Sequence, residues 1–63
     1  MRIDDVDENR QLRHVGLRLT VAEAKELRDS LGLLLSGAFD RHEHVSSADY
    51  QTEITVWLES DDG

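Results

Sequence analysis

The fold is decided by residues 20–37, which read TVAEAKELRDSLGLLLSG. Thr20 and Glu23 have the spacing of a capping box, in which each side chain accepts a hydrogen bond from the other residue's backbone N–H. Gly37 suits the left-handed conformation that ends many helices. We therefore predict a helix over residues 20–36. Its apolar residues recur at helical spacing, which predicts the stripe that faces the core. They are Ala24, Leu27, Leu31, Leu34 and Leu35.

The opposite side of this helix is expected to face water. It carries the acidic residues Glu23, Glu26 and Asp29, together with Leu33, which lies off the apolar stripe. An acidic surface usually serves solubility, and it also fits the footprint of a basic protein partner. These four residues are therefore candidate partner-binding residues.

A strand is predicted over residues 50–59, which read YQTEITVWLE. Alternate residues of a strand point to opposite faces, so Ile54 and Val56 share one face and Trp57 lies on the other. Exposing the whole indole of Trp57 wastes a large apolar surface, and tryptophan is enriched where proteins bind each other. Trp57 is therefore a further candidate partner-binding residue, unless it packs across Gly16 on a neighbouring strand.

Two more strands are predicted, over residues 11–19 and 42–47. If the helix reverses the chain, the first and last strands run antiparallel and pair, and the middle strand joins through a hairpin that turns at Ala48–Asp49. In an alternative, Ser46 and Asp49 cap a single helical turn instead.

The predicted fold class is α+β, with one amphipathic helix packed on a small antiparallel sheet. The elements follow the order β-α-β-β, and the strand order in the sheet is 1-3-2. Residues 11–59 form this single domain, residues 1–10 form a short, flexible N-terminal acidic arm, and residues 60–63 form a polar tail.

The composition limits the partners, the sites and the compartment that the protein can have. The net charge of −7 repels phosphate groups, which argues against nucleic acid and membranes as partners. The chain has no cysteine, which excludes disulfides and thiolate zinc sites and favours the cytoplasm. No apolar run approaches the ~20 residues that cross a bilayer. A core this small stabilises a domain by about 3–5 kcal/mol and is usually supplemented by a partner.

One set of side chains suits a chemical role. His42 and His44 share a face of the predicted strand, and a turn at Ala48–Asp49 places Glu53 opposite His44. Two imidazoles and a carboxylate are ligands that zinc and similar divalent ions accept, and Asp40 extends the pattern. The alternative is an ordinary cross-strand contact between His44 and Glu53.

No catalytic triad context and no glycine-rich phosphate loop occurs in the sequence. We therefore predict no enzymatic activity and no cofactor. The sequence favours a non-enzymatic protein-interaction module that acts as a homodimer or as an accessory subunit. An alternative is a neutraliser of a basic partner, in the manner of immunity proteins and antitoxins. A third hypothesis is a divalent-metal-binding protein that uses His42, His44 and Glu53.

Overall fold

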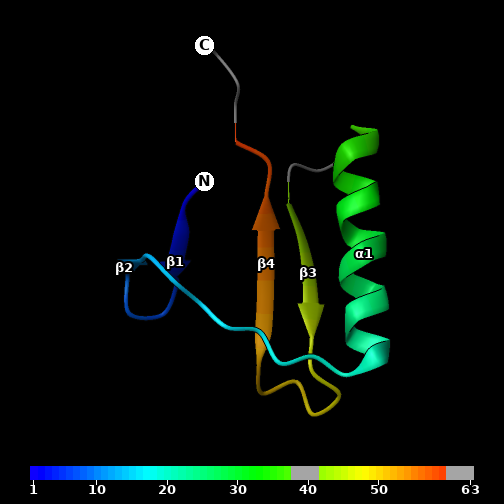
Figure 1. Ribbon diagram of the computed structural model, residues 1–63, viewed down its shortest axis with the longest axis horizontal. Coiled ribbons are helices and arrows are strands. Elements are labelled where there is room, and N and C mark those ends of the chain that lie inside the picture. The colour runs from blue at the N-terminus through cyan, green and yellow to red at the C-terminus, as the bar shows by residue number, and fades with distance from the viewer. Residues whose placement is uncertain (38–41, 60–63) are drawn as a thin grey trace.

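The computed structural model describes residues 1–37 and 42–59. Within these residues lie one helix and four strands. They are β1 (Ile3–Asp5), β2 (Arg10–Leu12), α1 (Val21–Ser36), β3 (His42–Ser46) and β4 (Glu53–Trp57). The strands pair antiparallel as two separate hairpins, β1–β2 and β3–β4 (Figure 1). The α+β class is therefore confirmed, whereas the single sheet of order 1-3-2 is wrong.

Helix α1 begins and ends where its capping residues predict. The backbone N–H of Glu23 donates to Thr20 Oγ1 at 3.1 Å, and the N–H of Thr20 donates to Glu23 Oε1 at 2.9 Å. Gly37 ends the helix in the left-handed conformation, with a φ of 67°. Its N–H donates to the carbonyl of Leu34 at 3.2 Å. The capping box and the glycine cap are therefore both confirmed.

The buried side of α1 is rotated relative to the predicted stripe. Leu34 is only 2% exposed and Leu27 is half-buried, but Leu31 is 44% exposed and Leu35 is 77% exposed. Ser30, which lies off the predicted apolar stripe, is half-buried. The cause is that α1 packs on β3, so only the rows of the helix nearest that strand are covered. The prediction that Leu31 and Leu35 belong to the core is wrong.

The β3–β4 hairpin has the predicted faces but different cross-strand neighbours. His44 lies opposite Thr55, and Ser46 lies opposite Glu53. The predicted two-residue turn is wrong, because the loop runs from residue 48 to residue 51 and is closed by a 2.8 Å hydrogen bond from the Ser47 N–H to the Thr52 carbonyl. This register differs from the predicted one by two residues. Since side chains alternate with a period of two, the faces are preserved.

The predicted strand over residues 11–19 is also wrong, because only Arg10–Leu12 forms a strand there, and it pairs with β1. The segment expected as a flexible arm thus supplies a strand. Polar residues fix the turn between β1 and β2: Asp5 Oδ1 accepts from the Glu8 N–H at 3.1 Å, and Asn9 has a left-handed φ of 53°. Pairing β2 with β1 closes a short loop. This costs less entropy than closing the long loop that pairing β2 with β4 requires.

Residues 13–20 connect β2 to α1 without regular structure and cross in front of β3 and β4 (Figure 1). Gly16 has open space around it, with no heavy atom within 4 Å of the position of a Cβ atom. The indole of Trp57 therefore does not pack on Gly16. Residues 60–63, expected as a polar tail, lie outside the described residues.

Asp49 holds the loop between β3 and β4. Its Oδ1 accepts from the Ser47 hydroxyl at 2.6 Å and from the Gln51 N–H at 3.0 Å. Ser47 Oγ in turn accepts from the Thr52 N–H at 3.1 Å. The hydrogen bonds from Ser47 and Gln51 favour the charged carboxylate, so the pKa of Asp49 is lowered in the folded chain.

We expect Leu34→Ala to lower the free energy of unfolding by about 2–5 kcal/mol, because it removes most of a fully buried side chain. Leu33→Ala is the matched control: the neighbouring leucine is 58% exposed, and an exposed site changes stability by less than about 0.5 kcal/mol. Urea unfolding followed by circular dichroism measures both. Equal unfolding midpoints for the two variants would contradict this core.

The lowered pKa of Asp49 predicts a dependence of stability on pH. A carboxyl group with a lower pKa in the folded chain stabilises it above the unfolded-state pKa, and this stabilisation is lost as the pH falls through the folded-state pKa. We expect Asp49→Asn to flatten the decline in melting temperature below about pH 5. Asp7→Asn removes one charge from the other turn and is the control. Parallel curves for wild type and Asp49→Asn would refute this role.

Candidate functional site

The β3–β4 hairpin has one polar face, and it carries most of the predicted chemistry. His42 lies opposite Trp57, and His44 lies opposite Thr55. Residues opposite each other in an antiparallel pair project from the same face, so these four side chains and that of Glu53 share one surface. Both histidines are exposed, and Trp57 is 55% exposed.

A close contact connects His44 to β4 on this face. His44 Nδ1 lies 2.9 Å from Glu53 Oε1 and 2.9 Å from Thr55 Oγ1. The ring of His42 meets that of His44 edge-on, with centroids 5.1 Å apart. Because Glu53 faces Ser46, its contact with His44 is diagonal. Diagonal neighbours on one face of a sheet are within reach of long side chains. His44 and Glu53 therefore contact each other as diagonal neighbours, and not as the directly opposite pair that the sequence predicted.

The metal hypothesis needs more than this pair. Among residues 1–37 and 42–59, no three His, Cys, Asp or Glu side chains are grouped so that they could hold a metal ion. His42, His44 and Glu53 share a face, and the carboxylate of Glu53 contacts Nδ1 of His44, so only Nε2 of that ring is left to face an ion. Asp40, which extended the pattern in the sequence, lies outside the described residues. Metal binding by these side chains stays a prediction.

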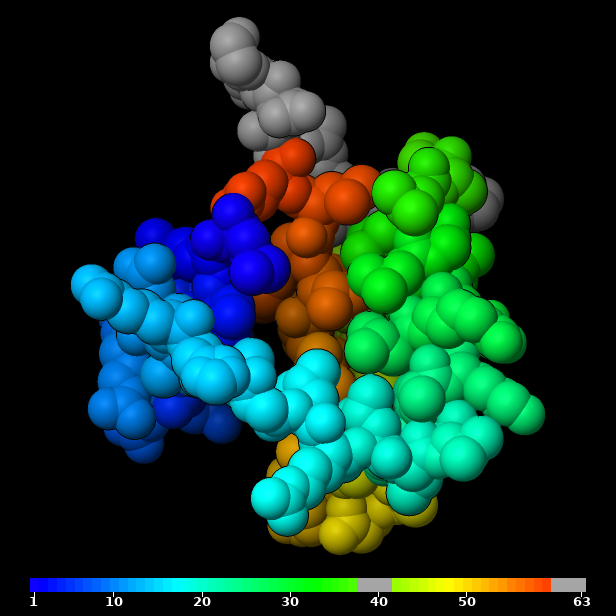
Figure 2. Space-filling model, in the orientation of Figure 1, coloured from blue at the N-terminus to red at the C-terminus, as the bar shows by residue number. Residues whose placement is uncertain are grey.

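The other face of the hairpin is largely aliphatic, with Glu43 opposite Val56. It carries Val45, which is 4% exposed, and the half-buried Ile54 and Val56. Leu58 continues the same alternation just after β4 and is exposed. Because α1 packs on β3, β4 stays partly uncovered. Figure 2 shows β4 at the base of a hollow between α1 and the β1–β2 hairpin.

Helical geometry places an exposed leucine row beside this hollow. In a right-handed helix, Leu31 and Leu35 lie about 60° and about 100° around from Leu34, in the same sense. Figure 1 shows the chain rising through α1, with β3 and β4 on one side of the helix. Because α1 packs on β3, a turn in this sense leads from the covered side of the helix toward the face seen in Figure 2, where the hollow opens. We call the surface formed by Leu31, Leu35, Val56 and Leu58 the aliphatic face.

The acidic side of α1 is largely engaged within the chain. Glu23 closes the capping box, and Asp29 Oδ1 pairs with Arg28 Nε at 3.2 Å. Glu26 has no ion pair with a described residue. The predicted partner-binding residues therefore do not lie together on one surface. Leu33 is turned away from the aliphatic face, and Trp57 lies on the polar face of the hairpin.

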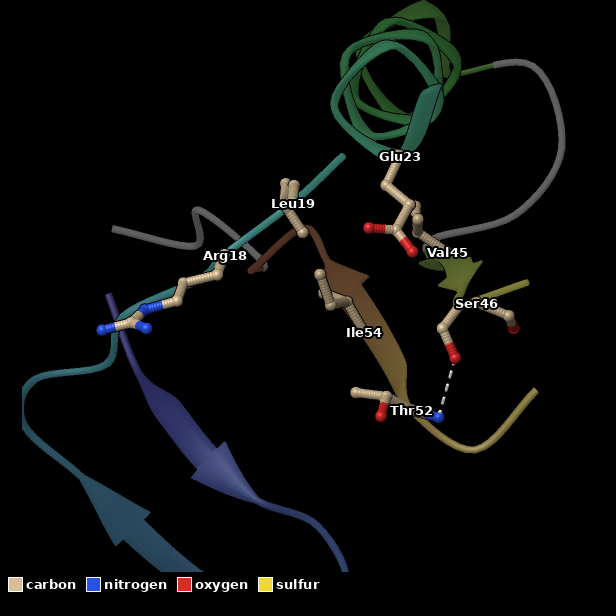
Figure 3. Close-up of a pocket in the computed structure, with 8 residues that line it drawn as sticks. Arg18, Leu19, Glu23, Val45, Ser46, Thr52 and Ile54 are labelled. Atoms are coloured by element: carbon tan, nitrogen blue, oxygen red, sulfur yellow. Dashed lines mark hydrogen bonds between the residues drawn. The ribbon is translucent and has the colours of Figure 1, made fainter. Parts of the chain in front are cut away.

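A small cavity of about 170 Å³ lies under the start of α1 (Figure 3). Leu19 of the connector, Val45 and Ile54 line its apolar part, and Glu23 and Ser46 border it. The guanidinium group of Arg18 extends away from it. A pocket for a drug-sized ligand has a volume of about 300–1,000 Å³. This cavity is therefore better described as the incompletely filled edge of the core than as a substrate site.

Comparisons with known proteins add no relative. No protein-family model matches the sequence, and no curated protein or solved structure is significantly similar to it. Within the described residues, no helix combines the length and the apolar character that a membrane-spanning segment requires. The function must therefore be argued from the surfaces alone.

The metal hypothesis is decided by a zinc titration of the full chain, followed through the imidazole NMR signals. We expect the signals of His42 and His44 to stay unchanged at one equivalent of zinc, because these histidines and Glu53 are not grouped closely enough among the described residues to hold an ion. His14, which is exposed outside the hairpin, is the internal control. Shifts at His42 and His44 without shifts at His14 would instead establish a metal site there.

Proposed function

We propose that the chain is a non-enzymatic protein-interaction module that binds another protein through its aliphatic face. It acts as a homodimer or as an accessory subunit of a larger assembly. We place it in the cytoplasm, which its cysteine-free, acidic composition favours. In this proposal the bound protein supplies the apolar contacts that a larger domain finds within its own core.

One observation carries the proposal: Leu34 and Val45 are the only apolar side chains among the described residues that are fully buried. Two buried side chains make a very small core, and small domains commonly gain stability by association. Large apolar side chains remain in water around this core, and a contiguous exposed apolar surface marks a site of interaction. They include Val15, Leu17, Leu31, Leu35 and Leu58.

The neutraliser of a basic partner is the alternative, and it rests on the net charge of −7. Its predicted footprint was Glu23, Glu26 and Asp29. Since Glu23 and Asp29 have partners within the chain, only Glu26 offers its whole charge to another protein. The exposed leucines thus support an apolar contact more strongly than the acids support a charged one.

The test compares what the tagged full chain retains from cells that also express an untagged copy. We expect the double variant Leu31→Lys and Leu35→Lys to lose a protein that the wild type retains. A lysine at an apolar contact leaves its charge without water or a counter-ion. Lysine is a good helix former and suits the last turn of a helix, so α1 is expected to persist.

Leu33→Lys makes the same change on the other side of α1 and is the matched control. It is expected to retain the same protein as the wild type. Quantitative mass spectrometry identifies the retained proteins, including the untagged copy. If neither the untagged copy nor any other protein distinguishes the double variant from Leu33→Lys, the proposed function is wrong.

A further inference from the structure

The aliphatic face combines a protrusion with a hollow. α1 and the β1–β2 hairpin stand on either side of β4 (Figure 2), and the row formed by Leu31 and Leu35 lies on the side of α1 that borders the hollow. Val56 and Leu58 lie on the hollow's side of β4. Both complementary shapes, the leucine row and the apolar base beside it, thus belong to one face of the molecule.

This arrangement suits a two-fold axis. In an isologous interface the same patch of both subunits meets itself, so each copy must carry both the inserting and the receiving surface. We propose that the occupant of the aliphatic face is a second copy of this chain, with the Leu31–Leu35 row of each copy packed against Val56 and Leu58 of the other. This inference rests on the proposed function and names its partner.

The surface area of the chain is consistent with a missing subunit. A folded monomer of this mass exposes about 4,100 Å², whereas this chain exposes 5852 Å². The excess of about 1,700 Å² per chain is larger than the ~800 Å² that each partner buries in a standard interface. The radius of gyration, 12.6 Å, likewise exceeds the ~11 Å of a compact domain of this length.

The net charge of −7 suits a basic partner, but the local charge around the connector favours a second copy. Residues 10–22 contain Arg10, Arg13 and Arg18 and no acid. This stretch includes the connector, residues 13–20, which crosses in front of β4 (Figure 1). None of the three arginines pairs with a carboxylate of the described residues. A basic partner places like charges against them, whereas a second copy of this acidic chain brings carboxylates.

Sedimentation velocity of the purified full chain tests this inference across a wide range of concentrations. We expect reversible dimers, and we expect Leu35→Lys to raise the dissociation constant by about 30-fold or more, as for an important interface residue. Leu35 is 77% exposed in the single chain, so this substitution leaves the core intact. Circular dichroism of the same samples confirms that α1 is present.

Leu33→Lys is again the control, because it makes the same change of charge in the last turns of the same helix. We expect its dissociation constant to stay within about threefold of wild type, since it lies outside the interface. A dimer that Leu35→Lys and Leu33→Lys weaken equally would overturn the assignment of the surface.

A folded wild-type chain that stays monomeric at every concentration would overturn the second copy as the occupant. The retention experiment still decides the proposed function in that case. A different protein lost only from the Leu31→Lys and Leu35→Lys double variant would keep the interaction module and replace its partner. The two ideas can therefore fail separately.

Discussion

The packing of α1 against β3 is the constraint on which the structure depends. It buries Leu34 and Val45, the fully buried apolar side chains among the described residues, and it fixes which side of the helix is covered. Because α1 packs on β3, it leaves β4 partly uncovered. The same contact that stabilises the fold therefore leaves an aliphatic face in water.

The sequence was most informative where a feature depends on neighbouring residues. The capping box of Thr20 and Glu23, the glycine cap at Gly37 and the alternation of β4 are local, and all three were predicted correctly. His44 and Glu53 were also placed correctly on one face, because the observed register differs from the predicted one by two residues, which preserves the faces. These features need no knowledge of what lies across the molecule.

The errors arose where distant segments compete. The apolar stripe from Leu27 to Leu35 is wider than the part of α1 that β3 covers, and the sequence does not indicate which part that is. β2 pairs with β1 and not with β4, because pairing with β1 closes a shorter loop. The aliphatic face was missed for the same reason: Leu31 and Leu35 were assigned to the core, and a pattern of spacing does not distinguish a covered leucine from an uncovered one.

The loop between β3 and β4 has a consequence for how this small protein can change. A slide of one strand along the other by two residues keeps Val45, Ile54 and Val56 on the inner side, so burial alone does not choose between the two alignments. The choice falls to the polar contacts of Ser47 and Asp49. Altered loops can therefore give His42, His44 and Trp57 new neighbours while the inner side stays as it is. Residues of the polar face can therefore change with little effect on the stability of the fold.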